Sequence, residues 1–284
     1  LQSVLSPDNA RRKQGEQSLE ASQQQDAKKL MEEMYSCLNN EKDDVANLAC
    51  VLFKKYFLDE ESVDTETLKV LEENIFNILD PARTTLVLHA QGGVIVKVFA
   101  KLGQIETLLH KIIELSSHEN ATIRELSMYM LEILVDVHIP QDLAKNHIDD
   151  FKKIFCQGLA DSDLKVRVSS LKATGAFITS LEDSTIAMNL ADTVGVCLNI
   201  MIEALKENED SGKSALESFI DMAEFHPDLF KEYGSNLVDV ISQIMLNKDF
   251  EDGTRSSAKE ILISLADKAP GLVRKIEEVK SKFY

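Results

Sequence analysis

The sequence predicts an all-α protein that forms a right-handed α-solenoid of about seven repeats, each an antiparallel pair of helices. Three observations support this fold class. Apolar residues recur at steps of three and four nearly everywhere, as in Leu164, Val168, Leu171, Gly175 and Ile178. Glycine and proline are sparse, and each proline stands where one helix should stop or the next begin. Short polar links join the helices, and such links leave the two helices of a pair antiparallel.

The helix pairs follow one another along the chain. The first helices of the clearest pairs are expected at 65–79, 104–117, 142–160 and 232–247. The second helices are expected at 120–137, 161–181, 211–226 and 253–269.

A basic residue near the start of the second helices marks the repeat. In chain order the marks are Arg12, Val45 in place of a basic residue, Arg83, Arg124, Arg167, Lys213 and Arg255. Successive marks lie 33 to 46 residues apart, close to the spacing of HEAT and armadillo arrays. Arg83 is the least certain mark, because its helix could start several residues later.

The arginine mark has a structural explanation. Asp161 or Asp163 can cap the helix that follows, where a carboxylate also favours the positive end of the helix dipole. Arg167, one turn further on, can then pair with an acid of the adjoining repeat. We therefore favour a structural role for Arg167 over contact with a ligand.

The repeats are expected to form a single continuous array over residues 1–284. Residues 1–58 would hold the N-terminal repeats, 65–269 the further repeats, and 270–284 the first helix of a truncated repeat. The chain opens LQSVLSPDNA, with neither an initiator Met nor a signal peptide, so we expect a fragment of a longer protein. No window approaches the roughly 18 uninterrupted apolar residues of a membrane span.

The formal net charge of -17 indicates the class of partner. Such a field repels nucleic acid and anionic membranes and attracts basic proteins. The four cysteines, at 37, 50, 156 and 197, show no CxxC spacing, and we interpret them as reduced core residues of an intracellular protein.

No pattern of catalytic residues emerges, so the sequence predicts no enzyme, cofactor or metal site. The histidines form no HExxH motif, and no phosphate-binding or nucleophile motif is present. Gly92 and Gly93 are interpreted as small residues that let helices approach closely, with a π-bulge or kink as the alternative. The basic run 10–13 is expected on an exposed helix face. The acidic runs 59–64 and 207–210 are expected in solvated turns, and a binding role for these acidic runs is the alternative.

Two parts of the sequence resemble a known family. LQSVLSPDNARRKQGEQSLE followed by NLACVLFKKYFLDE is similar to the N-terminal domain of importin-β superfamily nuclear transport receptors. SGKSALESFIDMAEFHPDLFKEY and GTRSSAKEILISLADKAPGLVRK resemble later repeats of the branch that includes importin five. Gly15 departs from the alanine usual in this family, and the first helix is cut to a few residues.

The resemblance implies a carrier of protein cargo that moves between cytoplasm and nucleus as a monomer. Its implied partners are the GTP form of the GTPase Ran, Phe-Gly nucleoporins on the outer helices, and basic nuclear cargo. Ran contacts are placed at Arg12, Glu16, Asn47 and Lys54. Basic-cargo contacts are placed at Glu125, Glu132, Asp136, Glu217 and Asp221. For each residue a plain solvated face is an open alternative, and for the whole chain so is a HEAT scaffold of the phosphatase-subunit or adaptor kind.

Overall fold

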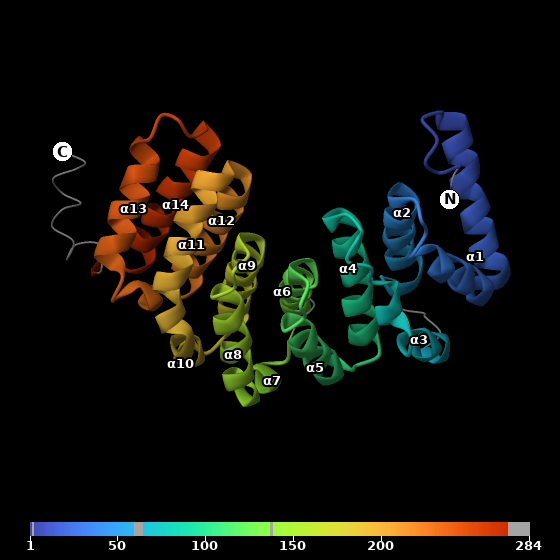
Figure 1. Cartoon of the computed structure of the whole chain (residues 1–284), viewed down its shortest axis with the longest axis horizontal. Helices are drawn as coiled ribbons and strands as arrows, with labels where there is room; N and C mark the ends of the chain where they lie inside the picture. The colour runs from blue at the N-terminus through green and yellow to red at the C-terminus, as the bar shows by residue number, and fades with distance from the viewer. Residues whose placement is uncertain (2, 60–64, 137–138, 272–284) are drawn as a thin grey trace. The chain divides into compact units, whose positions relative to one another are not determined.

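The computed structural model describes residues 1, 3–59, 65–136 and 139–271. The chain divides into two compact units, Leu1–Val137 (unit 1) and His138–Tyr284 (unit 2) (Figure 1). All regular elements of the described residues are helical, which confirms the predicted all-α class. The single array over 1–284 stays a prediction. Residues 60–64 of the acidic run, His138 and residues 272–284 of the predicted last helix lie outside the described residues.

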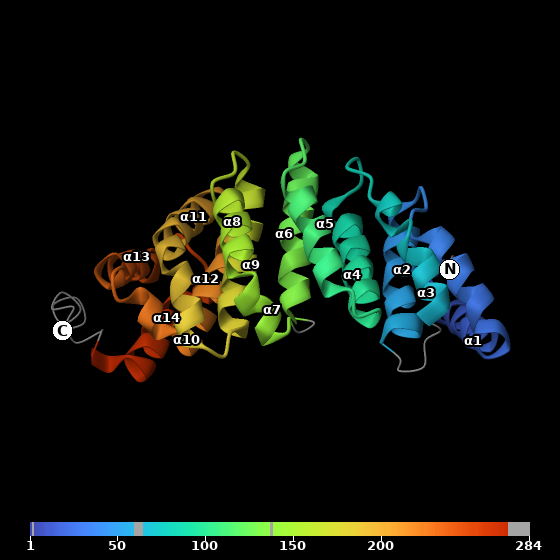
Figure 2. The same ribbon diagram turned by 90° about the horizontal axis from the view of Figure 1, so that it is seen from below.

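Unit 1 contains three second helices that pack side by side, α2 against α4 and α4 against α6 (Figures 1 and 2). Its elements are α1 (Asn9–Cys37), α2 (Asp43–Phe53), a π-helical turn (Lys54–Leu58), α3 (Thr65–Glu72), a 3-10 turn (Ile75–Ile78), α4 (Thr85–Lys101), α5 (Ile105–Ser116) and α6 (Ala121–Asp136). The helix predicted at 65–79 is therefore broken after Glu72.

Unit 2 repeats the same pattern with α9, α12 and α14 as its second helices. Its elements are α7 (Gln141–Asn146), α8 (Ile148–Leu159), α9 (Leu164–Ser180), α10 (Ser184–Ala187), a 3-10 turn (Met188–Thr193), α11 (Val194–Glu207), α12 (Glu209–Phe225), a 3-10 turn (Pro227–Phe230), α13 (Gly234–Leu246) and α14 (Asp252–Lys268). Each second helix packs on its own first helix, and α12 also packs on α9 and on α14. The predicted helix pairs are confirmed.

Helix α1 combines the second helix of one repeat with the first helix of the next. At Asp26 the backbone leaves helical geometry, with φ of -156° and ψ of 84°. The Asp26 carboxylate accepts a hydrogen bond from the Lys29 amide at 3.0 Å, so it caps the helix that restarts there. The part before Asp26 is mostly exposed, in agreement with the prediction for residues 10–13, whereas Leu30, Met31 and Met34 of the second part are buried.

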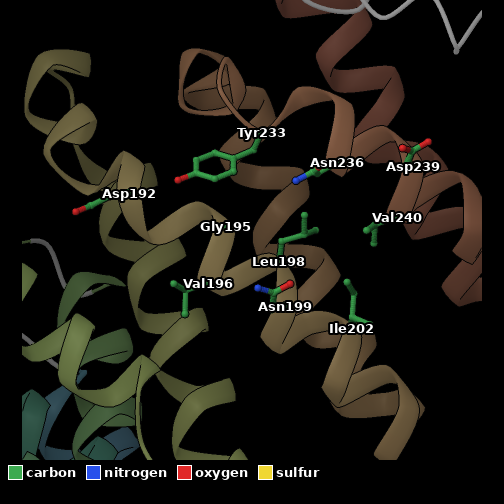
Figure 3. A pocket seen from close by; sticks show the side chains of 10 residues that line it. All are labelled: Asp192, Gly195, Val196, Leu198, Asn199, Ile202, Tyr233, Asn236, Asp239 and Val240. Atoms are coloured by element: carbon green, nitrogen blue, oxygen red, sulfur yellow. The ribbon is translucent and has the colours of Figure 1, made fainter.

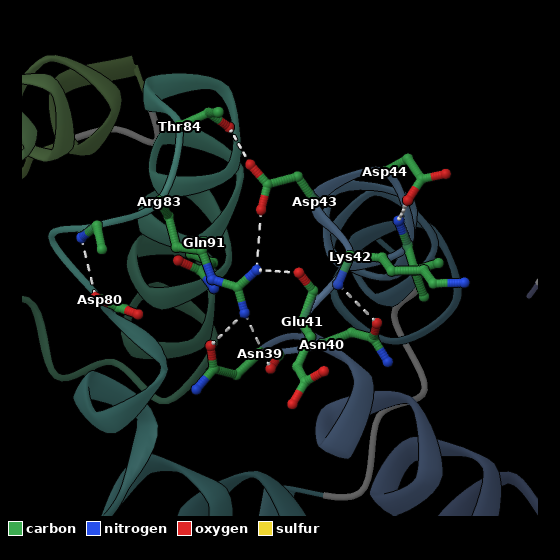
Figure 4. Close-up of polar contacts among 12 residues, drawn as sticks. Asn39, Asn40, Glu41, Lys42, Asp43, Asp44, Asp80, Arg83, Thr84 and Gln91 are labelled. Carbon is green, nitrogen blue, oxygen red and sulfur yellow. Dashed lines mark hydrogen bonds and ion pairs between the residues drawn. The ribbon is translucent and has the colours of Figure 1, made fainter.

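The arginine marks hold the turns between paired helices. Arg83 lies two residues before α4 begins, so the helix does start later than this mark. Its guanidinium donates to the carbonyl oxygen of Glu41 and to the Asp43 carboxylate, both at 2.9 Å (Figure 4). Arg83 therefore ties the start of α4 to the turn and helix start of the preceding repeat.

Arg167 contacts the following repeat, whereas Arg83 contacts the preceding one. It donates to the carbonyl oxygen of Asp161 at 2.8 Å within its own turn, and it forms an ion pair with Glu203 on α11 of the next repeat. Asp163 caps α9 by accepting from the Lys165 amide at 2.8 Å, which confirms one of the two predicted caps. Arg255, by contrast, pairs with Asp252 inside its own helix.

The glycine pair in α4 allows a close helix contact, as predicted. A Cβ atom on Gly92 would lie 2.9 Å from Leu126 Cδ1 and 3.0 Å from Met130 Cγ, both on α6. Segment 89–99 is regular α-helix, so the alternative of a bulge there is wrong. The π-helical turn of unit 1 is instead at Lys54–Leu58.

Two of the four cysteines contradict the prediction of core positions. All four are free thiols, and Cys50 and Cys197 are buried. Burial raises the pKa of each of these two thiols to about 12, which keeps them protonated. Cys37 is half-buried and Cys156 is exposed. Cys156 lies off the stripe of Phe151, Phe155 and Leu159 that α8 buries.

One run of unit 2, Ser184–Glu207, is long and apolar enough to cross a membrane by length and composition alone. It is divided into α10, a 3-10 turn and α11. Residues such as Leu190, Cys197 and Met201 are buried within the unit. Core helices of folded domains pass the same test of length and composition, so the run is weak evidence for a membrane span.

His226 connects the end of α12 to the end of α9. The side chain is buried, and Nε2 donates to the carbonyl oxygen of Leu181 at 3.1 Å. Burial lowers the pKa of His226 below its ordinary 6.5, against a smaller raising effect of the carbonyl groups of Leu181 and Ile178. The neutral ring is therefore the form that stabilises unit 2.

This burial predicts acid sensitivity. Because the folded pKa is lower than the unfolded one, the contribution is fully present above pH 6.5 and is lost as the pH falls through the folded pKa. Between pH 7.5 and pH 5, we expect the unfolding free energy of His226→Gln to fall less than that of the parent chain, because glutamine does not titrate. Urea unfolding at both pH values measures it. The exposed His110→Gln is the control, and equal pH dependence of the parent and His226→Gln would refute the assignment.

Candidate interaction surfaces

The second helices of unit 1 meet around Gly93. A Cβ atom on Gly93 would lie 3.3 Å from Lys54 Nζ and 3.8 Å from Ile133 Cδ1. The side chain of Lys54, at the end of α2, therefore reaches across α4 toward α6. We call the exposed or partly exposed side chains Asn47, Lys54, His89, Lys97, Tyr129 and Asp136 the second-helix face of unit 1.

Lys54 is a half-buried cation that forms no ion pair with any carboxylate of the described residues. Asp59, whose charge raises the pKa of Lys54, pairs with Lys97, and residues 60–64 lie outside the described part of the chain. Burial, followed by repulsion from Lys97, lowers the pKa of Lys54. A desolvated ammonium group of this kind gains most when a partner supplies a carboxylate.

Next to this cation the same face carries a paired acid. His89 Nε2 lies 3.0 Å from both carboxylate oxygens of Glu125, and the His89 ring stacks on Tyr129 with 3.6 Å between ring centres. Glu125 is only 8% exposed. Burial, and then the charges of Glu132, Glu125 and Asp136, raises the pKa of Tyr129, so the phenol stays protonated.

The predicted Ran residues fall into two groups. Asn47 and Lys54 lie seven residues apart and so share a side of α2 and its π-helical continuation. Arg12 and Glu16 are exposed on the part of α1 before the kink at Asp26, and Arg12 donates to Asn9. The structure brings Lys54 close to Lys97, and on the same face the ring of His89 stacks on Tyr129. The sequence analysis did not single out Lys97, His89 or Tyr129 for Ran.

The predicted cargo residues also differ in their surroundings. In unit 1, Glu125 is buried against His89, Glu132 is half-buried and Asp136 is exposed. In unit 2, Glu217 and Asp221 are both exposed on α12, one turn apart. Burial, and then the charges of Glu224 and Glu217, raises the pKa of Asp221.

A groove in unit 2 lies between α11 and α13, two first helices (Figure 3). Its volume is about 460 Å³, and Val196, Leu198, Ile202 and Val240 form its apolar lining. Tyr233 lies against Gly195, where a Cβ atom would come within 2.6 Å of Tyr233 Cε1. Sequence reasoning placed a nucleoporin groove on the outer helices without naming residues. The exposed Val196 beside Gly195 was the available signal.

The titratable side chains do not form a metal centre in the part of the chain that the structure describes. There, no group of three or more His, Cys, Asp or Glu residues could hold a metal ion. The functional candidates are three surfaces: the second-helix face of unit 1, the exposed side of α12 with Glu217 and Asp221, and the groove between α11 and α13.

Two family models match the chain. Residues 100–240 match the family described as IPO5-like, TPR repeats, and residues 247–283 match the family described as Importin repeat. The chain belongs to the importin-β family. The two importin matches are adjacent and together extend over the last helix pair of unit 1 and most of unit 2.

The curated relatives that the chain matches are also importins. The importin chain is 25% identical to the probable importin-5 homolog of Dictyostelium discoideum over 169 residues, which cover 59% of this chain and 16% of that protein. It is 25% identical to importin subunit beta-3 of Saccharomyces cerevisiae over 251 residues, which cover 81% of this chain and 22% of that protein. The importin chain thus matches about a fifth of the length of these relatives.

Solved structures show the same fold. Kap121p superposes with a TM-score of 0.79 and 23% identity, over 96% of the importin chain and 26% of Kap121p. Kap121p bound to RanGTP gives a TM-score of 0.79 and 23% identity over 95% of the importin chain and 26% of Kap121p. The helix pairs of the importin chain are therefore HEAT repeats of the karyopherin type.

Proposed function

We propose that the importin chain is part of a nuclear import receptor that binds GTP-loaded Ran, Phe-Gly nucleoporins and basic cargo, and shuttles through the nuclear pore as a monomer. The observation that carries the proposal is the pair of adjacent importin family matches over residues 100–240 and 247–283. They favour a transport receptor over the scaffold or adaptor alternative, which shares only the helix-pair architecture.

The Ran contact is placed on the second-helix face of unit 1, together with Arg12 and Glu16. Lys54 is the strongest candidate in this set, because it is a half-buried cation that no carboxylate of the described residues neutralises. A carboxylate of a partner would relieve this cost, and exposed Val51, 48% accessible on the preceding turn of α2, supplies an adjacent apolar contact.

The basic-cargo contacts are placed on the acids of both units. Glu217 and Asp221 are accessible carboxylates that basic side chains can approach directly. Glu125 is already paired with His89, so a cargo cation would have to displace the imidazole. We therefore assign the larger share of cargo binding to Glu217 and Asp221. Glu132 and Asp136 contribute the smaller share.

The experiment that tests the function is a titration of the 284-residue chain with Ran in its two nucleotide states. We expect binding of the GTP form at least about 100-fold tighter than of the GDP form, which corresponds to about 2.8 kcal/mol. Equal affinity for the two forms, or binding to neither, would overturn the Ran part of the proposal.

The Phe-Gly nucleoporins are assigned to the groove between α11 and α13. Its apolar lining by Val196, Ile202 and Val240 suits a phenylalanine ring, and its size suits one side chain with part of its backbone. Amide groups of Asn199 and Asn236 at the rim can hydrogen-bond the backbone of the peptide.

A charge in this groove should weaken nucleoporin binding without unfolding unit 2. Val196 is 44% exposed, so Val196→Glu keeps its carboxylate solvated while placing it beside the bound phenylalanine. We expect about tenfold weaker binding of a Phe-Gly repeat peptide, measured by fluorescence anisotropy. Leu246→Glu, on α13 but outside the groove lining and 73% exposed, is the matched control and should bind as the parent does. Unchanged binding by Val196→Glu would place the nucleoporin elsewhere.

A further inference from the structure

The amine of Lys54 lies in an opening of the second-helix face that Gly93 leaves in α4. A Cβ atom on Gly93 would lie 3.3 Å from Lys54 Nζ, so any larger residue would crowd the amine. Ile133 Cδ1 of α6 lies 3.8 Å from the same point. Lys54 is nevertheless partly exposed. The amine is therefore desolvated by the backbone of α4 on one side and open to small molecules on another.

The charges that act on Lys54 come from α2, its π-helical continuation and α4. Lys97, one turn beyond Gly93 on the same side of α4, repels the ammonium. Asp59 attracts it but forms an ion pair with Lys97. Cys50, four residues before Lys54, is a buried thiol that stays protonated because burial raises its pKa to about 12. These surroundings disfavour the charged form of the lysine.

Helix α6 does not offset this effect. It faces the amine with the apolar Ile133. Three acids of α6 also belong to this region of unit 1, and none of them is among the charges that act on Lys54: Glu125, Glu132 and Asp136. Glu125 is paired with His89, and all three acids act on Tyr129 by raising its pKa.

Lys54 therefore has the environment of a nucleophilic amine. Burial and the Lys97 charge lower its pKa, so a larger share of the amine is neutral near pH 7.5 than in an ordinary lysine. Desolvation beside a second cation is the arrangement that activates lysine as a nucleophile. Other lysines are held as ammonium by carboxylates within 3 Å, for example Lys69 by Glu66 and Lys111 by Glu114.

The neighbouring cations favour an electrophile that carries negative charge. Lys55 is exposed and Lys97 is partly exposed, so both can attract an anionic reagent to this part of the face. The acyl thioesters of coenzyme A combine an electrophilic carbonyl carbon with anionic phosphates. Such a thioester is small enough to reach the open side of the amine.

We propose that Lys54 is an acylation site that reacts with acyl thioesters of the coenzyme A class. The neutral amine attacks the carbonyl carbon, an N–C bond replaces the C–S bond, and the proton lost by the nitrogen goes to the departing thiolate. The amide that forms carries no charge. Acylation therefore removes the cation that the proposed function assigns to Ran, and only this consequence rests on the proposed function.

The test treats the full 284-residue chain with acetyl-CoA, without any enzyme, and follows each lysine by tandem mass spectrometry. The exposed Lys55 is the internal reference. At pH 7.5 we expect the initial rate at Lys54 to be at least about threefold that at Lys55, because the neutral fraction rises about tenfold for each unit by which a pKa falls. The ratio should shrink toward pH 9.5. A rate at Lys54 no faster than at Lys55, or a ratio that does not shrink, would overturn the proposal.

Variants test the electrostatic cause at pH 7.5. Asp59→Asn removes the attracting charge and should speed acylation of Lys54 severalfold. Lys97→Met removes the repulsion, leaves Asp59 unpaired with Lys97 and should slow it severalfold. Lys111→Met on α5 changes the net charge equally and should leave the rate at Lys54 unchanged. Faster acylation in Lys97→Met, or slower acylation in Asp59→Asn, would contradict the inference.

Ran separates this inference from the proposed function. When the GTP form is added before acetyl-CoA, we expect acylation of Lys54 to slow severalfold, while Lys111 reacts as before and the GDP form has no effect. Fast acylation that GTP-loaded Ran does not slow would support the acylation site and contradict the Ran contact at Lys54. Slow acylation in the absence of Ran would overturn the acylation site and leave the Ran contact standing.

Discussion

Replacing Phe177 by alanine is expected to lower the unfolding free energy of unit 2 by about 3–5 kcal/mol. Phe177 on α9 is fully buried between Phe151 and Phe155 of α8, with ring centres 4.3 Å and 5.4 Å apart. The substitution leaves a cavity where the two helices of one pair meet. It also removes two ring contacts, each stabilising by about 0.5–1.5 kcal/mol beyond the buried area.

Hydrogen exchange followed by mass spectrometry measures the loss of stability in unit 2 specifically, because peptides from α8 and α9 report on unit 2 alone. Peptides from α4 in unit 1 provide the internal reference. Phe225→Ala is the matched control, since the same change at a ring that is 60% exposed should cost less than about 0.5 kcal/mol. A loss below about 1 kcal/mol for Phe177→Ala would contradict the described packing of α8 on α9.

Replacing Lys54 by methionine is expected to weaken binding of GTP-loaded Ran by about 10- to 100-fold, or about 1.4–2.8 kcal/mol. The methionine keeps most of the stem that crosses Gly93, but it removes the ammonium group that a partner carboxylate would neutralise. Because Lys54 is half-buried and has no carboxylate partner among the described residues, the free chain should lose no stability, and its melting temperature should stay equal or rise.

Lys55→Met is the control for this experiment. Lys55 is the next residue, it is exposed, and its ammonium lies 5.3 Å from the centre of the Tyr56 ring. The two variants change the net charge equally, so they share any effect of long-range attraction. Equal losses of affinity in both variants would show that Lys54 acts only through the long-range electrostatic attraction that it shares with Lys55. Parent affinity in Lys54→Met would remove it from the interface.

The sequence was sufficient to predict the repeats because their signals are local. Apolar spacing defines each helix, and the cap at Asp163 with the arginine four residues later marks the turn. The direction of the arginine contacts was not predictable. Arg83 pairs with the preceding repeat, through Asp43, and Arg167 with the following one, through Glu203. Which acid is in reach depends on how adjacent repeats stack, which no single turn encodes.

The candidate sites were predicted less completely, for a related reason. Helical periodicity placed Glu125 on a polar side of its helix, but the approach of His89 from α4 buries it. The kink at Asp26 and the π-helical turn at Lys54–Leu58 likewise follow from packing between repeats.

The central claim is that Ran and basic cargo bind on the exposed sides of second helices. Hydroxyl-radical footprinting of the importin chain, alone and with Ran in each nucleotide state, tests it most directly. With the GTP form, we predict that oxidation of Val51 and Tyr129 falls severalfold while that of Leu246 stays constant, and that the GDP form changes none of them. Unchanged oxidation of Val51 and Tyr129 with GTP-loaded Ran, or equal protection by both forms, would contradict the claim.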